Sequence, residues 1–272
     1  MSVTERPLSG VPVSGDGAGL AIWAEGLVKH FDKVQAVNGL DLEVKSGEFF
    51  GFVGPNGAGK TTTIKMLTGA LRPTAGTARV AGYDVVSQTL EVKRRIGVMP
   101  EEPTLYERLT GREFVIFAGQ MHGLTRAEAA KRAHDLLELM EMGAAADRLI
   151  VDYSHGMRKK VALSAAVIHA PQVLFLDEPF QGVDAVSGRV VREVLRLMVR
   201  RGATIFFTSH IMETVERLCD RMAVIDHGRI IGVGTLETLR ARAAEGAHAT
   251  LEDVFVRLVR GDEEEAVNLE WL

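Results

Sequence analysis

The 272-residue chain is 46% hydrophobic and 25% charged, with a formal net charge of −4, which is typical of one large globular domain with a sizeable core. This charge does not favour binding to nucleic acid or to an acidic membrane surface, and the single cysteine, Cys219, excludes an internal disulfide. No run approaches the ~20 consecutive apolar residues that cross a bilayer, and the N-terminus lacks a secretory signal pattern. We therefore expect a protein of a reducing compartment that cannot form a membrane path alone.

The two ends of the chain differ in composition from its middle. Residues 1–20 hold Ser, Gly, Pro and Val without a period, which predicts a flexible lead-in. Residues 241–272 contain a short helical pattern at 251–259, followed by the acidic run 262–265. Such a run is more typical of a solvated tail than of a binding element. Residues 21–240 form the predicted main domain.

Within the main domain, hydrophobic patterns of strands alternate with those of helices. Strands are expected at 40–44, 49–53, 77–80, 96–99, 173–176 and 203–208, and helices at 61–71, 109–142, 158–169 and 186–200. Pro73 is expected to close the first helix, and the pairs Thr110/Glu113 and Thr125/Glu128 predict capping boxes. Residues 222–226 and 229–233 flank His227 and Gly228 as in a hairpin. This order predicts a mostly parallel α/β sheet with a helical insertion between its halves.

A glycine-rich loop follows the predicted strand at 49–53. Residues 54–61 read Gly-Pro-Asn-Gly-Ala-Gly-Lys-Thr, which matches the phosphate-loop pattern. In such a loop, main-chain N–H groups and the following helix N-terminus surround anionic oxygens. Lys60 can reach the β- and γ-phosphates, and the Thr61 hydroxyl can ligate Mg²⁺. A glycine-rich structural turn remains the alternative, but the strand–loop–helix context favours binding of a nucleoside triphosphate.

The predicted strand at 173–176 ends in two carboxylates, Asp177 and Glu178. Asp177 suits a Mg²⁺ ion, held directly or through water, and Glu178 can orient and deprotonate an attacking water. Taken alone, the pair is also typical of a solvated strand end. Downstream of a phosphate loop, it predicts nucleotide hydrolysis.

The segment Tyr153-Ser-His-Gly-Met157 stands directly before a predicted helix. Ser154 is placed as an N-cap and Gly156 allows close approach of a backbone, so this helix start could bind a second phosphate group. One chain cannot easily direct two such devices at one γ-phosphate. A head-to-tail dimer, in which each loop closes over the other chain's nucleotide, accounts for both. A simple capped helix accounts for the pentapeptide equally well.

In this order, the motifs resemble those of the nucleotide-binding domains of ABC transporters, over residues 22–239. The resemblance implies an ATP hydrolase with a P-loop NTPase core, a mostly parallel sheet, an antiparallel β subdomain and a helical subdomain at about 102–170. The nucleotide site that it implies consists of Gly54, Pro55, Asn56, Gly57, Ala58, Gly59, Lys60, Thr61 and Thr62, with Phe31 stacking on adenine. Phe31 could instead be a core or merely exposed aromatic.

The resemblance also implies roles for residues outside the phosphate loop. Glu178 becomes the catalytic carboxylate, His210 the histidine that contacts the γ-phosphate, and Asp184 the residue that communicates between two sites. The loop that covers the other chain's ATP, called the signature loop below, consists of Tyr153, Ser154, His155, Gly156 and Met157. A histidine at a strand end, as His210 is expected to be, is otherwise often structural.

The chain departs from the family pattern at two places. The signature usually reads Leu-Ser-Gly-Gly-Gln; this chain keeps the serine and the second glycine, so we expect little effect. Glu101 follows Pro100 where the family typically has a glutamine that reaches Mg²⁺ and senses the membrane partner. A carboxylate can still ligate Mg²⁺ but adds negative charge. The predicted metal ligands are therefore Thr61, Asp177 and Glu101, with an altered metal dependence.

The family implies transport powered by ATP through a separate membrane-spanning permease. Two cassettes, identical or related, would dimerise at the cytoplasmic face of the cell membrane, held there by the permease, and the segment around 101–114 would pass their motion on. Residues 100–106, 153–158 and 250–255 are similar to the export branch that handles drugs, antibiotics, lipids or sodium.

The alternative function is a soluble ABC-type ATPase that acts on ribosomes or DNA. DNA-repair members carry a long coiled coil between the phosphate and signature loops, and translation-type members carry two cassettes. This chain has about 90 residues there and one set of motifs. The signature loop has no role in kinases or GTPases, which argues against these classes. Glu178 and His210 both serve hydrolysis, which argues against an ATP-binding module without activity. We expect no nucleic acid partner.

Overall fold

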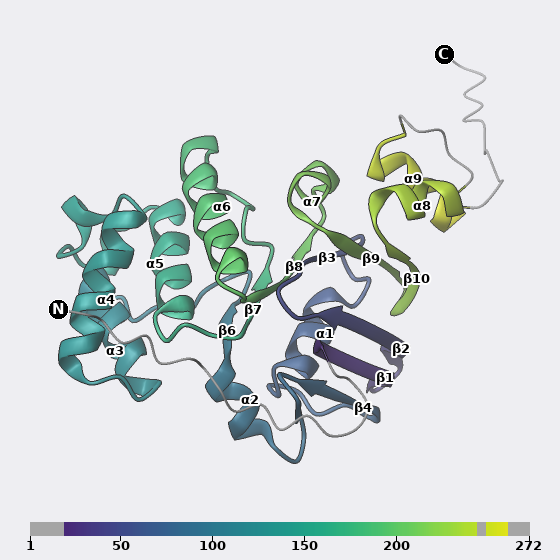
Figure 1. Ribbon diagram of the computed structural model, residues 1–272, viewed down its shortest axis with the longest axis horizontal. Helices are drawn as coiled ribbons and strands as arrows, with labels where there is room; N and C mark the ends of the chain where they lie inside the picture. The colour runs from purple at the N-terminus through teal and green to yellow at the C-terminus, as the bar shows by residue number, and fades with distance from the viewer. Residues whose placement is uncertain (1–18, 244–248, 261–272) are drawn as a thin grey trace.

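The computed structural model of the protein describes residues 19–243 and 249–260. The predicted flexible lead-in, except for its last two residues, and the acidic run at 262–265 lie outside the described residues. The structure is an α/β fold built on two sheets, with helices packed around the larger one (Figure 1).

The larger sheet has six strands in the order β10-β9-β3-β8-β7-β6. Its strands are β3 (Phe49–Val53), β6 (Ile96–Met99), β7 (Val173–Asp177), β8 (Thr204–Ser209), β9 (Arg221–Asp226) and β10 (Arg229–Gly234). Neighbouring strands pair in parallel except β9 and β10, which form the predicted hairpin across His227 and Gly228. The sheet is therefore mostly parallel, as the alternating pattern predicted.

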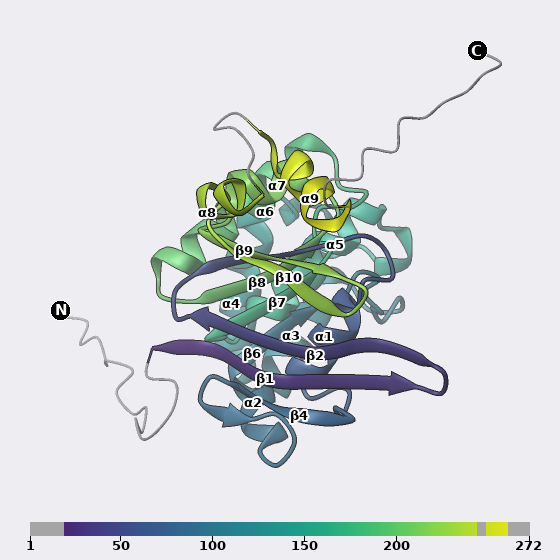
Figure 2. The same ribbon diagram turned by 90° about the vertical axis from the view of Figure 1, so that its right-hand side faces the viewer.

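The smaller sheet is antiparallel, with the order β2-β1-β4-β5. It consists of β1 (Leu20–Phe31), β2 (Val34–Lys45), β4 (Ala75–Val80) and β5 (Tyr83–Asp84). Figure 2 shows the long strands β1 and β2 crossing the molecule below the edge formed by β9 and β10. This sheet corresponds to the antiparallel β part that the family resemblance implied.

The helices lie on both sides of the larger sheet and at one end of it. They are α1 (Lys60–Leu67), α2 (Thr89–Arg95), α3 (Gly111–Met121), α4 (Arg126–Leu139), α5 (His155–Val167), α6 (Ala185–Arg200), α7 (Met212–Leu218), α8 (Leu236–Arg242) and α9 (Leu251–Arg260). Helices α3, α4 and α5 gather at the end of the molecule opposite α8 and α9 (Figure 1). The limits of 102 and 170 for a helical subdomain stay a prediction.

The central strands are buried on both faces because each contributes side chains to two cores. In β8, Ile205 and Phe207 belong to the core under α5 and α6, whereas Phe206 belongs to the core shared with the antiparallel sheet and α1. This alternation follows the two-residue period of a strand. All residues of β3, β7 and β8 are buried, as expected for parallel strands covered on both sides.

The local signals at helix ends were partly right. Both predicted capping boxes are present, at Thr110 with Glu113 and at Thr125 with Glu128. The expected single helix over 109–142 is two helices, because the second capping box starts α4 after the turn at Gly123, where φ is +87°. The expectation that Pro73 closes the first helix was wrong: α1 ends at Leu67, followed by Gly69 at φ +67°.

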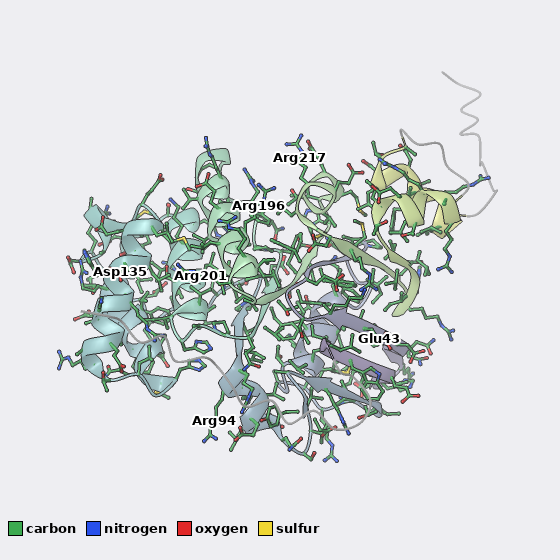
Figure 3. The ribbon with its side chains drawn as sticks, viewed as in Figure 1. Glu43, Arg94, Asp135, Arg196, Arg201 and Arg217 are labelled. Atoms are coloured by element: carbon green, nitrogen blue, oxygen red, sulfur yellow. The ribbon has the colours of Figure 1, made fainter. Side chains whose placement is uncertain are left out.

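Charged side chains cover the outer surface of the described chain. Examples on four elements, all exposed and labelled in Figure 3, are Glu43, Arg94, Asp135 and Arg217. Among the described residues, no helix has both the length and the apolar character that a membrane span requires.

Candidate active site

The phosphate loop joins β3 to the N-terminus of α1 and depends on glycine for its path. Gly59 has a φ of +106°, and a Cβ added there would lie 2.5 Å from the main-chain oxygen of Ala36. Lys60 curls back along the loop, and its Nζ donates to the main-chain oxygens of Gly54 at 2.7 Å and Pro55 at 3.2 Å. The ammonium is therefore held over the loop, where phosphate oxygens bind in this motif.

Asp177 at the end of β7 connects the loop to the neighbouring strand. Its Oδ2 accepts a hydrogen bond from the Thr61 hydroxyl at 2.7 Å, and its Oδ1 accepts one from the Thr208 hydroxyl at 2.5 Å. The carboxylate is buried. The hydrogen-bond network holds Asp177 beside Thr61, as the proposed metal role of the pair requires.

Glu178 is held in a conformation that is unusual for its residue type. It is 4% exposed and has a φ of +49°, a left-handed conformation that costs of order 1–3 kcal/mol outside glycine and persists only where its surroundings enforce it. Its N–H donates to Thr208 Oγ1 at 3.1 Å. Its carboxylate lies 3.6 Å from Lys60 Nζ and 3.0 Å from His210 Nδ1.

One carboxylate oxygen of Glu178 lacks a hydrogen bond. Oε1 is buried and accepts no hydrogen bond from the described residues, although Lys60 Nζ lies 3.6 Å from it as an ion-pair neighbour. A buried acceptor without a partner costs about 1–3 kcal/mol, and such an atom beside a phosphate loop is suited to accept a proton from a water molecule. This geometry is compatible with the predicted role of Glu178 as the catalytic carboxylate.

A pocket of about 360 Å³ unites the two motifs. It is lined by Ala36, Pro55, Asn56, Gly57, Gly59, Lys60, Thr61, Thr62, Glu101, Asp177 and Glu178. The structure thus brings Glu101 to the same pocket as the phosphate loop. Gly54 and Ala58 are buried in the loop itself, and His210 joins the site through Glu178.

The oxygen donors at this pocket fit a magnesium ion. Mg²⁺ prefers hard oxygen ligands and is usually held by one or two carboxylates together with substrate phosphates and water. A hydroxyl and two carboxylates, from Thr61, Asp177 and Glu101, line the pocket. The described residues contain no cluster of three or more His, Cys, Asp or Glu side chains suited to a metal, so an ion here depends on the nucleotide for further ligands.

Phe31 does not line this pocket among the described residues. It ends β1, is 44% exposed, and carries the Lys29 ammonium 5.1 Å from its ring centroid. An exposed aromatic is available to a base, so stacking on adenine stays a prediction.

The signature loop lies away from the phosphate pocket of its own chain. Its residues 153–157 do not line that pocket. Ser154 caps α5, with Oγ accepting from the Met157 N–H at 3.3 Å, and Ser154 and His155 are exposed. Tyr153 is instead buried, and its hydroxyl donates to the Ala145 main-chain oxygen at 2.6 Å. The Tyr153 side chain therefore anchors the signature loop to the domain interior and is not available to a ligand at the surface.

The signature loop contacts the loop that carries Asp184. A Cβ built on Gly182 would lie 3.0 Å from the His155 ring, and one built on Gly156 would lie 3.8 Å from Asp184 Oδ2. Asp184 also caps the next helix, because its Oδ1 accepts from the Ser187 N–H at 2.9 Å. The residue predicted to communicate between sites thus lies beside the signature loop of its own chain.

Sequence reasoning missed three residues of this region, namely Ala36, Thr208 and Lys159. Lys159 is a buried lysine whose Nζ donates to the Glu178 main-chain oxygen at 2.7 Å. Thr208 ends an apolar strand, which is a weak signal for a polar role. Ala36 and Lys159 carry no such signal, because a small residue in a strand and a lysine in a helix are both common.

Comparison of the sequence with known proteins supports an ATP-binding role. The family model described as ABC transporter matches residues 37–181. A daunorubicin/doxorubicin resistance ATP-binding protein of Streptomyces peucetius is 44% identical over 81% of this chain and 67% of its own length. A linearmycin resistance ATP-binding protein of Bacillus subtilis is 41% identical over 80% of this chain and 70% of its own length.

Solved structures agree with these relatives. The ATP-binding subunit of an ABC transporter matches with a TM-score of 0.82 and 30% identity, over 88% of this chain and 99% of that one. A second cassette, solved as a dimer after hydrolysis with ADP and phosphate, has a TM-score of 0.73 at 21% identity over 79% of this chain and 98% of that one, which shows the shared fold. The chain belongs to the ABC transporter family, as an ATP-binding cassette that hydrolyses ATP.

Proposed function

We propose that this chain is the ATPase of an exporter in which two cassettes enclose two ATP molecules and drive a separate membrane-spanning permease. One observation carries the proposal. The exposed helix N-terminus at Ser154 does not line the phosphate pocket of its own chain. A second cassette placed head to tail would set its Ser154 against the ATP of the first and complete both sites.

The residues of one phosphate pocket divide the work of hydrolysis. The loop N–H groups and Lys60 hold the β- and γ-phosphates, while Thr61, Asp177 and Glu101 would hold Mg²⁺, which neutralises phosphate charge when bound. Glu178 accepts the proton of the attacking water, and His210 holds the opposite carboxylate oxygen. The partner's signature loop contacts the γ-phosphate, and Asp184 passes the state of one site to the other.

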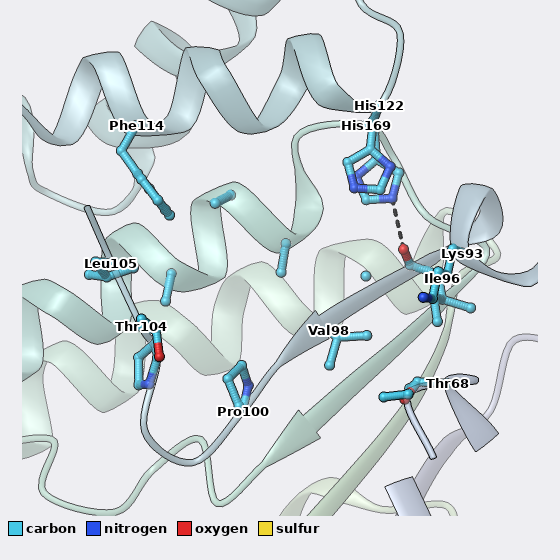
Figure 4. A pocket seen from close by; sticks show the side chains of 16 residues that line it. Thr68, Lys93, Ile96, Val98, Pro100, Thr104, Leu105, Phe114, His122 and His169 are labelled. Atoms are coloured by element: carbon cyan, nitrogen blue, oxygen red, sulfur yellow. Dashed lines mark hydrogen bonds between the residues drawn. The ribbon is translucent and has the colours of Figure 1, made fainter. Parts of the chain in front are cut away.

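A second pocket supplies the docking surface for the permease. It has a volume of about 470 Å³ and lies between β6 and the helices α3 and α5 (Figure 4). Pro103, Thr104, Leu105 and Phe114 line it, all within or at the end of the segment expected to transmit motion. Nearby, Tyr106 packs edge-on against Phe114 and Phe117.

The neighbourhood of this pocket exposes apolar side chains that a soluble domain usually covers. Tyr106 is 57% exposed and Met121 at the end of α3 is 70% exposed. Exposed apolar side chains gathered beside a groove are typical of an interaction surface. We assign this surface to a cytoplasmic segment of the permease, which would hold the cassette at the membrane. The resistance and export proteins among the relatives favour an exported drug or antibiotic as cargo.

The membrane role is tested by purifying the tagged chain from its native membranes in mild detergent. We expect a protein with several membrane spans to co-purify in near-equal amount. Met121→Glu should lower its recovery at least about tenfold, because a charge buried in an apolar contact is costly. Val34→Glu, at an exposed apolar residue on β2, serves as the matched control and should keep the partner. Recovery of the wild-type chain with ribosomes or DNA in the soluble fraction would refute the proposal.

The two-cassette mechanism is tested separately with the purified chain. Glu178→Gln should bind Mg²⁺-ATP without hydrolysing it and form a dimer that light scattering detects. Lys60→Ala should not bind ATP and should remain monomeric. A Glu178→Gln protein that binds ATP yet stays monomeric at saturation would exclude the dimer with shared sites.

A further inference from the structure

Lys159 connects the helix that follows the signature loop to the main chain of Glu178. It lies in the second turn of α5, is only 2% exposed, and donates from Nζ to the Glu178 main-chain oxygen at 2.7 Å. Lysines are almost never fully buried unless they are paired, because removing an ammonium group from water is costly. This contact to a catalytic loop is therefore a specific arrangement, and none of the motifs accounts for it.

The Glu178 main chain is held from both sides. Its N–H donates to Thr208 on β8, and its carbonyl accepts from Lys159 and, at 3.3 Å, from the Gln181 N–H. These bonds enforce the left-handed φ of +49°. Because the side chain leaves the same Cα, rotation of either peptide group would move the carboxylate away from Lys60 and His210. Lys159 thus contributes to the aim of the catalytic carboxylate without reaching the substrate.

The charge of Lys159 also has nearby counterparts. Burial lowers the pKa of Lys159, while the carboxylates of Glu101, Glu178 and Asp177, in that order, favour its charged form. Glu101 is the residue that replaces the neutral glutamine of the family pattern. Asp177 and Glu178 are buried, and Glu101 is an exposed residue that lines the same pocket. Carboxylates gathered at one pocket repel each other unless a cation offsets them. Lys159 reaches the main-chain oxygen of Glu178 from α5, and Lys60 Nζ lies 3.6 Å from the Glu178 carboxylate on the side of the phosphate loop.

We propose that Lys159 is a positioning residue for ATP hydrolysis, which orients Glu178 through its main-chain oxygen and balances the negative charge of Glu101. Lys159 stands five residues after Ser154 on one continuous helix, a rise of about 7 Å. In the proposed two-cassette mechanism, on which this part of the inference rests, α5 therefore links the loop that covers the partner's ATP to the carboxylate that hydrolyses the chain's own ATP.

The test uses the full chain in four variants, built from three substitutions. Lys159→Met keeps the length of the side chain and removes the charge and the donor. Glu101→Gln is made alone and in combination with it. The matched control is Lys160→Met, which removes the neighbouring buried lysine, whose Nζ lies 3.8 Å from Glu141 Oε2. The readouts are kcat and KM for ATP, ATP binding in EDTA, thermal melting and light scattering.

We expect Lys159→Met to fold, to bind ATP in EDTA as the wild type does, and to lose roughly 10- to 100-fold in kcat with KM changed less than about threefold. Its slow hydrolysis should let it accumulate as a dimer in Mg²⁺-ATP, as Glu178→Gln does. Adding Glu101→Gln should restore kcat at least about fivefold, because the unbalanced charge is removed. Lys160→Met should keep kcat within about twofold, because it leaves the Glu178 carbonyl bonded.

Three results would overturn the proposal. The first is a wild-type kcat in Lys159→Met, and the second is a loss of kcat that Glu101→Gln does not relieve. The third is a parallel loss of ATP affinity and melting temperature, which a purely structural lysine would produce. If Glu178→Gln itself stays monomeric, the two-cassette mechanism fails instead, and the kcat, the KM and the rescue by Glu101→Gln still decide the role of Lys159.

Discussion

His169 offers a test of how burial at the proposed docking pocket controls stability. Its ring stacks on that of His122 with centroids 3.6 Å apart, and its Nε2 bonds the Ile96 main-chain oxygen at 3.0 Å (Figure 4). Burial, and secondarily the positive charge that His122 can carry, lower the pKa of His169 from 6.5 to about 4. Arg132 adds a smaller effect of the same sign, and Lys93 lines the same pocket.

The direction of the pH effect follows from this difference in pKa. The unfolded chain takes up a proton at His169 near pH 6.5, whereas the folded chain does so only near pH 4. The contribution of the neutral ring to stability is therefore complete above pH 6.5 and is lost progressively as the pH falls to about 4. At about 1.4 kcal/mol per pKa unit, the loss between pH 7.5 and 4.5 is at most about 2.5 kcal/mol. Because the ring is partly exposed, we expect about 1 to 2 kcal/mol.

The assay is urea unfolding followed by circular dichroism at several pH values between 7.5 and 4.5. His169→Gln keeps an N–H donor near the Nε2 position and removes the titrating ring, so its free energy of unfolding should fall less with pH than that of the wild type. His134→Gln, at an exposed histidine on α4, should follow the wild-type curve. If His169→Gln and the wild type lose stability equally between pH 7.5 and 4.5, the reasoning from burial is wrong.

Three further predictions concern the phosphate pocket. Thr208→Val removes the hydroxyl that joins Asp177 to the Glu178 N–H. Calorimetry should therefore show a loss of about 2–3 kcal/mol in the free energy of unfolding, and kcat should fall. An unchanged kcat would contradict this prediction. Gly59→Ala should bind no ATP when measured by titration calorimetry, because the added Cβ would collide with the Ala36 carbonyl. The control is Gly202→Ala, where φ is +90° and the space around the residue is open; it should only lower stability by about 1 kcal/mol. Glu101→Gln should shift the Mg²⁺ concentration for half-maximal hydrolysis several-fold. The control is Glu102→Gln, at the next residue along the chain, which is exposed. The same shift in both variants would argue against a specific role of Glu101.

Local patterns predicted much of the fold because they act over a few residues. The capping boxes, the β9–β10 hairpin and the buried strands all depend on near neighbours in sequence. The strand order does not: β3 pairs with β8, and Phe50 stands beside Phe206. A uniformly apolar strand is compatible with any central position in a parallel sheet, so the order depends on packing across the whole domain. The early end of α1 depends similarly on Gly69, whose left-handed φ brings the chain against Val85 and Thr89.

In the candidate site too, residues whose role depends on neighbours in sequence could be predicted, and residues whose role depends on packing could not. The phosphate loop, Asp177 and Glu178 were accessible to sequence reasoning because contiguous residues create their chemistry. Lys159 was not, since it belongs to a run of three basic residues that normally indicates a solvated helix face. The structure buries it because α5 lies between α3, α6 and the sheet and exposes little of its length. In the proposal above, Lys159 offsets the negative charge that Glu101 adds 58 positions earlier in the chain, because a buried charge is tolerated mainly together with an opposite one.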